Sequence, residues 1–342
     1  MIKKNVTMSD VAKVMGVSTV TVSKALGDRE GVSESLRERI KQKATEMGYR
    51  MHTGGHARKD GLTYNIGIII AKHFISEPSA FYWIMYRHLV ELLRRQNYYG
   101  MLEAVDDVSG ADDTCEVPNF VRDRKIDGLI LLGQFSDNYI DKLMSYNIPT
   151  VFLDFYGSRD DADTVLSDNF YGAYLLTSHL VANGHRRIGF LGSIVSTSSI
   201  QDRYLGYYKA LLENRLMLRN DWIIGDRTSE GEIYKSFALP KELPTAFVCN
   251  CDESAFRLVN QLRSLGLRIP EDISIAGYDN HIYSTMCQPH LTTIDVDSRQ
   301  MAHEAVEIIL HKIRDGSYKR SRTLVTGKLI CRDSVKKLNA ET

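Results

Sequence analysis

Three short helical patterns fill the first 47 residues, and their caps and breaks constrain the fold more than any other feature. Thr7 and Asp10 have the spacing of a capping box, and Gly16 ends the helix that they begin after about two turns. Ser18 is a suitable N-cap for a second helix over Thr19–Leu26, and a third helical pattern follows. Two short helices around a tight glycine-containing turn, braced by a third, predict a helix-turn-helix. The apolar side chains expected to face inward are Val11, Ala12, Met15, Val22, Leu26, Leu36, Ile40, Ala44 and Met47.

The outer face of the second predicted helix carries short side chains and one long cation, from Thr19 to Lys24. Short side chains let a helix approach base edges closely, a helix N-terminus favours phosphate, and a lysine reaches a guanine edge or a phosphate. We therefore predict DNA contacts; the alternative is a three-helix bundle with no role on DNA. The predicted DNA-binding residues are Thr7, Ser18, Thr19, Val20, Thr21, Ser23, Lys24 and, further along the chain, Arg58.

Charge is distributed unevenly along a chain whose formal net charge is zero. Residues 1–60 hold 12 Lys and Arg against 7 Asp and Glu, whereas the remainder holds 31 against 36. A basic N-terminal segment on an acidic remainder suits a nucleic-acid partner for that segment alone, although an ordinary solvated surface is also compatible with it.

Beyond residue 62, β-rich apolar runs alternate with helical stretches, a pattern typical of parallel sheets covered by helices on both faces. We predict an α/β body of doubly wound parallel sheets in two lobes, in preference to one large sheet, with a ligand between the lobes at the carboxyl ends of the strands. The predicted strands are Ile66–Ala71, Gly128–Leu132, Thr150–Asp154, Thr164–Ser167, Arg187–Gly192, Ala246–Asn250, Ile273–Tyr278 and Leu291–Asp295. The predicted helices are Phe81–Gln96, Asp137–Ser145, Phe170–Ala182, Arg203–Glu213, Ser254–Leu265 and Arg299–Arg314.

These patterns predict three segments. A helix-turn-helix DNA-binding domain covers 1–50, a hinge or linker covers 51–63, and an effector-binding and dimerisation domain covers 64–342.

Polar and aromatic side chains follow several predicted strands or open the helices beside them. Carboxylates accept paired hydrogen bonds from adjacent hydroxyls, an arginine donates them, and aromatic faces pack on apolar ring faces, which together suit a sugar or similar polyol. Phe81 and Tyr82 could instead belong to the core, and Asp168 is better interpreted as a helix N-cap. The predicted effector-binding residues are Phe81, Tyr82, Asp154, Phe155, Ser199, Arg203, Cys251, Asp252 and Asp279.

The segment TMSDVAKVMGVSTVTVSKAL at residues 7–26, with EMGY at 46–49, resembles the opening of the LacI/GalR family of bacterial transcription regulators. The likeness continues at Ile126–Ile130, Asp168–Asn169, Leu180–Gly189, Gly277–Asp279 and Leu291–Ile294. It implies a periplasmic-binding-protein-like body that the chain crosses three times, with lobe 1 at about 64–167 and 297–326 and lobe 2 at about 168–294 and 327–338. It also implies that Thr19 and Val20 lead the base reading and that Arg203 and Asp279 contact the effector. Lys24 stands where an arginine is more usual in that family, and Cys251 stands where an asparagine is common.

The linker departs from the family pattern. Met51 replaces a usual proline, Gly54 and Gly55 lie where relatives form a short helix, and each glycine costs about 1 kcal/mol of helix relative to alanine. Counted from Tyr49, Arg58 occupies the position of the apolar side chain that wedges into the minor groove in relatives. We expect a weakly helical hinge that reads groove width and bends DNA little; a plain flexible linker is the alternative.

We expect a DNA-binding transcription regulator, a repressor of carbohydrate-use genes, that binds a palindromic operator as a homodimer and is switched by a sugar. A phosphoprotein corepressor could replace the sugar. A transport solute-binding protein would need the secretory signal that this N-terminus lacks. An enzyme is not expected, because no phosphate loop, dinucleotide fingerprint or nucleophile elbow is present.

No metal or other cofactor is expected, because Cys249 and Cys251 are too close for a zinc-ligand pair. Five scattered cysteines and the lack of any apolar run near ~20 residues predict a cytoplasmic chain without a membrane span.

Overall fold

The computed structural model describes residues 6–27, 30–47, 61–75, 81–106, 116–159, 161–315 and 321–338. The chain divides into two compact units, Met1–Leu62 and Thr63–Thr342. Residues 51–60 of the predicted linker, including Arg58, lie outside the described residues.

The N-terminal unit consists of α1 (Met8–Met15), α2 (Thr19–Leu26) and α3 (Glu34–Glu46). The capping box is confirmed: the Thr7 amide donates to Asp10 Oδ2 at 2.9 Å, and the Asp10 amide donates to Thr7 Oγ1 at 3.3 Å. Gly16 ends α1 with a φ of +64°, a conformation that favours glycine. The core residues of the unit are Val11, Ala12, Val22, Ala25, Ile40 and Ala44. Leu26 packs only at the margin of this core, where Ala25 takes the buried place predicted for it.

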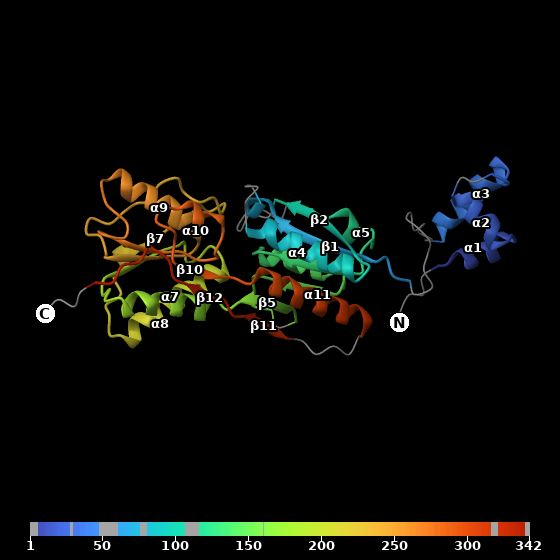
Figure 1. Cartoon of the computed structure of the whole chain (residues 1–342). Helices are drawn as coiled ribbons and strands as arrows, with labels where there is room; N and C mark the ends of the chain where they lie inside the picture. Colours follow the sequence, from blue (N-terminus) through green and yellow to red (C-terminus); the bar gives the residue numbers. More distant parts are fainter. Residues whose placement is uncertain are drawn as a thin grey trace. The chain divides into compact units, whose positions relative to one another are not determined.

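Lobe 1 of the second unit is built on a six-stranded sheet with the order β11-β5-β4-β3-β1-β2 (Figure 1), in which every neighbouring pair is parallel. Helices α4 and α11 pack on one face, and α5 and α6 on the other. The strands are β1 (Asn65–Ala71), β2 (Tyr99–Val105), β3 (Gly128–Leu132), β4 (Thr150–Leu153), β5 (Asp163–Ser167) and β11 (Arg322–Val325). The helices are the 3₁₀ turn η1 (Lys72–Ile75), α4 (Phe81–Arg95), α5 (Asn119–Arg122), α6 (Asp137–Met144) and α11 (Ser298–Arg314).

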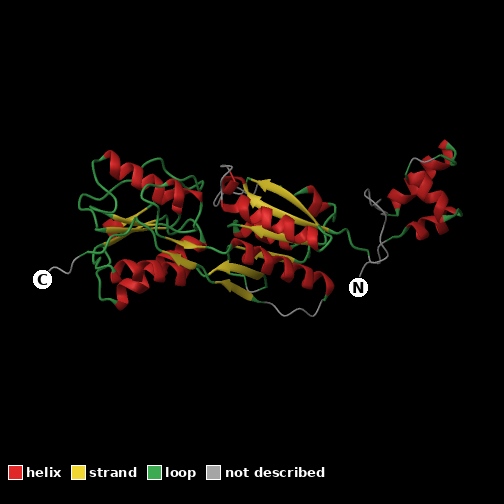
Figure 2. Cartoon of the chain, viewed as in Figure 1, coloured by secondary structure: helices red, strands yellow, loops and turns green. Residues whose placement is uncertain are grey.

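Lobe 2 is built on a four-stranded parallel sheet with the order β7-β6-β8-β9. Helices α7 and α8 cover one face and α9 the other, and Figure 2 shows the same helix–sheet–helix layering in both lobes. The strands are β6 (Ile188–Leu191), β7 (Ile223–Ile224), β8 (Ala246–Cys249) and β9 (Ser274–Ala276), with an antiparallel pair of β10 (Thr293–Asp295) and β12 (Lys328–Ile330). The helices are α7 (Asn169–Ala182), α8 (Ser198–Glu213), the 3₁₀ turn η2 (Asn220–Trp222), α9 (Asp252–Ser264) and α10 (Ile282–Met286).

The chain passes between the lobes three times, from β5 to α7, from β10 to α11 and from β11 to β12. The predicted fold class, a helix-turn-helix joined to two lobes of parallel sheet, is therefore confirmed. Because both lobes use parallel strands, the carboxyl ends of β1, β3 and β4 and those of β6, β8 and β9 are where a shared ligand site is expected.

The short strands β7, β11 and β12 and the short helices α5 and α10 were not predicted from the sequence. Two further elements, β2 and α8, were mispredicted for physical reasons. Strand β2 was missed because it is a half-exposed edge strand whose YGMLEAV sequence has no continuous apolar run. Helix α8 was expected to begin at Arg203 but begins at Ser198, because Thr197 caps it by accepting a hydrogen bond from the Ile200 amide. Arg203 thus lies in the second turn of α8, with Ser199 one turn before it.

Candidate functional site

The exposed face of α2 carries the predicted base-reading side chains. Thr19 and Val20 are exposed at the start of this helix, whereas Ser23 and Lys24 are partly buried. The Ser18 hydroxyl caps α2 by accepting from the Thr21 amide at 3.1 Å, and it also bonds the Thr21 hydroxyl. Of the predicted DNA-binding residues, therefore, Thr19 and Val20 present the most open side chains at this helix end.

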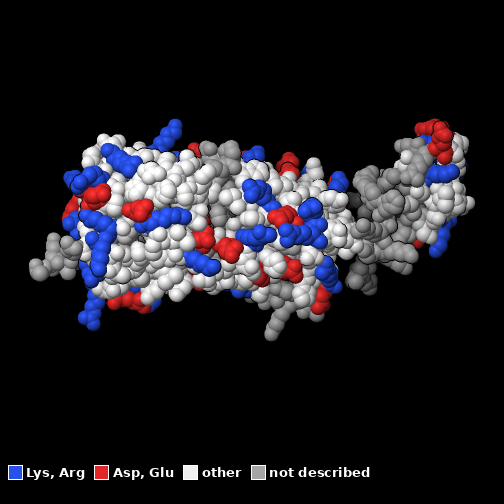
Figure 3. Space-filling view, viewed as in Figure 1, with Lys and Arg blue, Asp and Glu red and all other residues white. Residues whose placement is uncertain are grey.

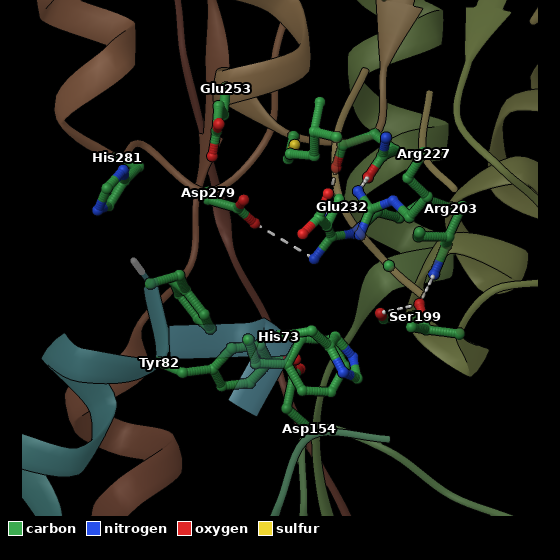
Figure 4. A pocket seen from close by; sticks show the side chains of 18 of the residues that line it. His73, Tyr82, Asp154, Ser199, Arg203, Arg227, Glu232, Glu253, Asp279 and His281 are labelled. Atoms are coloured by element: carbon green, nitrogen blue, oxygen red, sulfur yellow. Dashed lines mark hydrogen bonds and ion pairs between the residues drawn. The ribbon is translucent and has the colours of Figure 1, made fainter. Parts of the chain in front are cut away.

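A cavity of about 370 Å³ lies between the two lobes of the second unit. Its volume falls within the usual range for small-molecule sites, roughly 300–1,000 Å³. Figure 4 shows Tyr82, His73 and Asp154 on the lobe 1 side, facing Arg203, Arg227 and Asp279 on the lobe 2 side. A ligand held here would contact both lobes at once.

Asp154 supplies the least satisfied polar group of this cavity. It directly follows β4 and is 5% exposed; the Tyr82 hydroxyl donates to its Oδ2 at 2.9 Å. Its Oδ1 is buried and accepts no hydrogen bond from any described residue. Burial raises the pKa of Asp154, and the Arg203 guanidinium opposes that rise. A buried carboxylate oxygen without a donor is costly, so a ligand that donates to it gains binding energy.

Arg203 and Asp279 form a buried ion pair on the other side. Arg203 Nη2 lies 3.2 Å from Asp279 Oδ1, its Nε donates to Asn169 Oδ1 at 2.7 Å, and its Nη1 donates to the Asn250 carbonyl. The Tyr278 ring stacks under the guanidinium at 3.9 Å. These contacts hold the guanidinium in one orientation. Burial raises the pKa of Asp279 to about 7, against the opposing effect of Arg203.

Both cavity aspartates have strained backbones. The φ of Asp154 is +66° and that of Asp279 is +101°, although neither residue is glycine. Such conformations cost of order 1–3 kcal/mol each and cluster at functional sites. Each strained residue follows a strand, so the bend turns its carboxylate toward the cavity at the sheet edge.

A second arginine is fixed from behind by a buried carboxylate. Arg227 Nη2 donates to Asp226 Oδ2 at 2.9 Å and to Asn250 Oδ1 at 3.1 Å. Asp226 also accepts from the Ser193 amide at 2.9 Å and the Ser254 hydroxyl at 2.6 Å. Burial alone would raise the pKa of Asp226, but Arg227 and these hydrogen bonds hold it well below its ordinary value. Arg227 therefore enters the cavity as a rigid cation.

The cavity brings together most of the predicted effector-binding residues, namely Phe81, Tyr82, Asp154, Ser199, Arg203, Cys251 and Asp279. Two predicted residues do not line it. Phe155 is fully buried in the core of lobe 1, stacked on Phe152 with ring centroids 4.7 Å apart. Asp252 points inward, where it accepts from the Thr293 hydroxyl and the His281 amide, both at 2.8 Å. Asp168 caps α7, as interpreted from the sequence.

Comparison with known proteins decides the family. Residues 7–51 match the family described as "Bacterial regulatory proteins, lacI family", and residues 177–335 match the "Periplasmic binding protein-like domain". A curated relative from Haemophilus influenzae (strain PittEE), "HTH-type transcriptional repressor PurR", is 31% identical over 343 residues, which cover 97% of this chain and 99% of that protein. The chain belongs to the LacI family. It is accordingly a DNA-binding transcription regulator and not an enzyme.

Solved structures of LacI-family proteins share the fold. The lac repressor dimer bound to operator and the anti-inducer ONPF superposes with a TM-score of 0.66 at 23% identity, covering 97% of this chain and 100% of that chain. A LacI family regulator from Enterococcus faecium with bound ribose superposes with a TM-score of 0.67 at 23% identity, covering 80% of this chain and 100% of that chain.

Several cavity residues were not predicted from the sequence. Asn250 directly follows β8, and His281 lies two residues after Asp279. A search for polar side chains just beyond the strand ends could therefore have found both. His73 lies two residues beyond β1 and could have been found in the same way, whereas Arg227 comes from the loop after a two-residue strand that was not predicted. The other cavity residues missed are Phe74, Thr197, Ile200, Gly231, Glu232, Ile233, Lys235, Glu253 and Arg257.

The charged surface and the metal-ligating side chains of the described residues add little to this LacI-family site. On the face in Figure 3, Lys and Arg are interspersed with Asp and Glu over the second unit. Within the described ranges, no group of three or more His, Cys, Asp or Glu side chains could hold a metal ion. Among the helices that the structure describes, none is long and apolar enough to span a membrane.

Proposed function

We propose that this LacI-family regulator is a cytoplasmic, homodimeric repressor whose binding to a palindromic operator is switched by a sugar in the interlobe cavity. The observation that carries the ligand class is Asp154, which lines a cavity rich in both donors and acceptors and whose buried Oδ1 lacks a donor among the described residues. A sugar hydroxyl donates and accepts at one atom, so it suits a wall where carboxylates and guanidinium groups alternate.

The charge of the lining favours a neutral ligand. Four basic and four acidic side chains line the cavity: Arg203, Arg227, Lys235 and Arg257, and Asp154, Glu232, Glu253 and Asp279. The two sets are equal in number and form two pairs with one another, so even with Asp279 partly protonated the lining carries only a small positive excess, and neither an anionic nor a cationic ligand finds a large excess of opposite charge.

A nucleobase such as a purine is the second candidate, since the cavity also has an aromatic wall. Phe74 and Tyr82 lie with ring centroids 4.9 Å apart, but their planes are tilted by 53°. A flat base is held best between parallel faces, whereas tilted rings can pack on the C–H groups of a non-planar sugar ring. The ring geometry therefore favours the sugar.

The same cavity supports a switch. Tyr82 and Asp154 belong to lobe 1, and Arg203 and Asp279 belong to lobe 2, so a ligand that contacts all four stabilises the lobe arrangement in which they converge. A ligand shifts an equilibrium only by its differential affinity for the two states. In a homodimer, that shift changes the placement of two DNA-reading units that match the twofold symmetry of a palindromic operator.

The test combines a ligand screen with one isosteric variant. Thermal-shift screening of sugars, nucleobases and phosphosugars against the full chain should yield sugar hits, which calorimetry then quantifies. Asp154→Asn should weaken the hit by about 1.5–3 kcal/mol, because a hydrogen bond to a charged acceptor is lost. Asp123→Asn, at an exposed position of the same lobe, is the matched control. A nucleobase as the sole hit would replace the sugar assignment. A sugar that binds Asp154→Asn with wild-type affinity would remove Asp154 from the site.

A further inference from the structure

A second cavity of about 220 Å³ adjoins the interlobe cavity. The two share five wall residues, His73, Phe74, Thr197, Arg227 and Gly231, so they are neighbouring compartments of one hollow. We call the 370 Å³ cavity that contains Asp154 and Asp279 the inner compartment, and the 220 Å³ cavity the outer compartment.

Gly231 stands at the boundary between the compartments. Its φ is +88°, and a Cβ at this position would lie 2.7 Å from Cδ2 of His73. Because both residues belong to both linings, a side chain at 231 would fill space that the two compartments share. The absence of a side chain here avoids a clash with His73 and leaves the space between the two compartments unfilled.

The outer compartment has its own set of polar side chains. Gln134 contributes an amide, Ser196 and Ser229 contribute hydroxyls, and Glu230 contributes a carboxylate. Val195, which is 89% exposed, adds an apolar side chain at the rim. An amide, hydroxyls, a carboxylate and one apolar contact are again the partners of a hydroxylated ring.

Arg227 links the two sets. It lines both compartments, and Asp226 and Asn250 hold its guanidinium in place from the lobe 2 side. A planar guanidinium has five N–H groups in a fixed fork, so one anchored arginine can donate to two neighbouring rings.

We propose that the effector has two linked sugar units, a disaccharide or the end of a longer saccharide, with one unit in each compartment. The inner unit meets Asp154, Arg203 and Asp279, the outer unit meets Ser229 and Glu230, and the link passes Gly231 beside Arg227. This inference rests on the proposed sugar effector and specifies its class.

The experiment compares monosaccharides with their dimers on the full chain. Calorimetry measures glucose, galactose, mannose and xylose, and the α-1,4- and β-1,4-linked dimers of each. At least one dimer should bind about tenfold more tightly than its monosaccharide, as two added hydrogen bonds provide. Ser229→Trp, an exposed position of the outer compartment, should abolish that gain while the monosaccharide affinity stays within about twofold. Ser264→Trp, an exposed position on α9 outside both linings, should change neither affinity.

Each other outcome overturns the proposal. Equal affinity for a monosaccharide and its dimers would still agree with a sugar effector, but it would show that the outer compartment is only an entrance to the inner one and binds no sugar unit. A Ser229→Trp variant that weakens both ligands equally would also reduce it to an entrance, because a blocked entrance affects every ligand. A chain that binds no sugar of either length would refute the sugar effector itself, together with this inference.

Discussion

Asp279 gives the sharpest quantitative prediction, because its carboxylate is both buried and functional. Its side chain is 12% exposed, and burial raises its pKa from 3.8 to about 7 although Arg203 works against the rise. An acid whose pKa is raised on folding holds its proton more tightly in the folded state. Its contribution therefore favours folding at low pH and is lost as the pH rises from about 4 toward 7.

The magnitude follows from the two pKa values. At 1.36 kcal/mol per pKa unit, the full rise corresponds to about 4 kcal/mol, of which about 2–3 kcal/mol is lost between pH 5 and pH 8. Asp279→Asn resembles the protonated side chain and lacks this dependence. The free energy of unfolding of the wild type, relative to Asp279→Asn, should therefore fall by about 2–3 kcal/mol from pH 5 to pH 8.

Urea unfolding of the effector-free chain at pH 5, 6, 7 and 8 measures this difference. Titrating groups that do not interact with Asp279, such as His185, occur in both proteins and cancel to first order in the comparison. A difference that stays constant over this pH range would show that Asp279 is ionised throughout, and the reasoning about the buried pair would be wrong. A difference that grows in the opposite direction would show that Arg203 dominates its environment.

Two further predictions concern the helix α2 and a hydrogen bond between the two lobes. If Lys24 reads a base edge, Lys24→Ala should weaken operator binding by about 1–3 kcal/mol. If it contacts a phosphate, the variant should bind all DNA more weakly and lower the slope of log affinity against log salt concentration by about one. Unchanged gel-shift affinity for every DNA would show that α2 is not the recognition helix. Tyr156→Phe removes the 2.8 Å hydrogen bond from lobe 1 to Asp202 of lobe 2, which stabilises this lobe arrangement, so the effector should bind about fivefold more weakly for a loss near 1 kcal/mol. Tyr99→Phe, at an exposed edge-strand position, is its control, and an effect equal to that control would show that the bond does not influence the lobes.

The N-terminal unit was predictable because its signals are local. The capping box of Thr7 and Asp10 and the N-cap at Ser18 operate within four residues, so sequence spacing alone determines where α1 and α2 begin. The prediction that Leu26 lies in the core was wrong, because α2 turns Ala25 and not Leu26 toward the other two helices. That orientation depends on packing between helices, which spacing does not encode.

The candidate site was predictable where residues follow strands. Parallel strands end at one edge of a sheet, so the sequence alone could place Asp154 and Asp279 beside a common cavity. Their neighbours could not be placed in this way, because the left-handed backbone at Asp154 and the start of α9 at Asp252 turn adjacent side chains in different directions. Phe155 thus turns into the core next to Asp154, and Asp252 turns inward next to Cys251. Arg227 follows the two-residue strand β7, which has no recognisable sequence pattern, so no signal in the sequence pointed to it.

A gel-shift experiment on the full chain, with and without the sugar identified by screening, tests the central claim most directly. We predict that a palindromic fragment is retarded in preference to random DNA and that the sugar changes this affinity by at least about fivefold. Asp154→Asn should bind the same fragment but need roughly ten- to hundredfold more sugar to respond. Retardation of all DNA alike, or an operator affinity that a bound sugar leaves unchanged, would contradict a ligand-switched regulator.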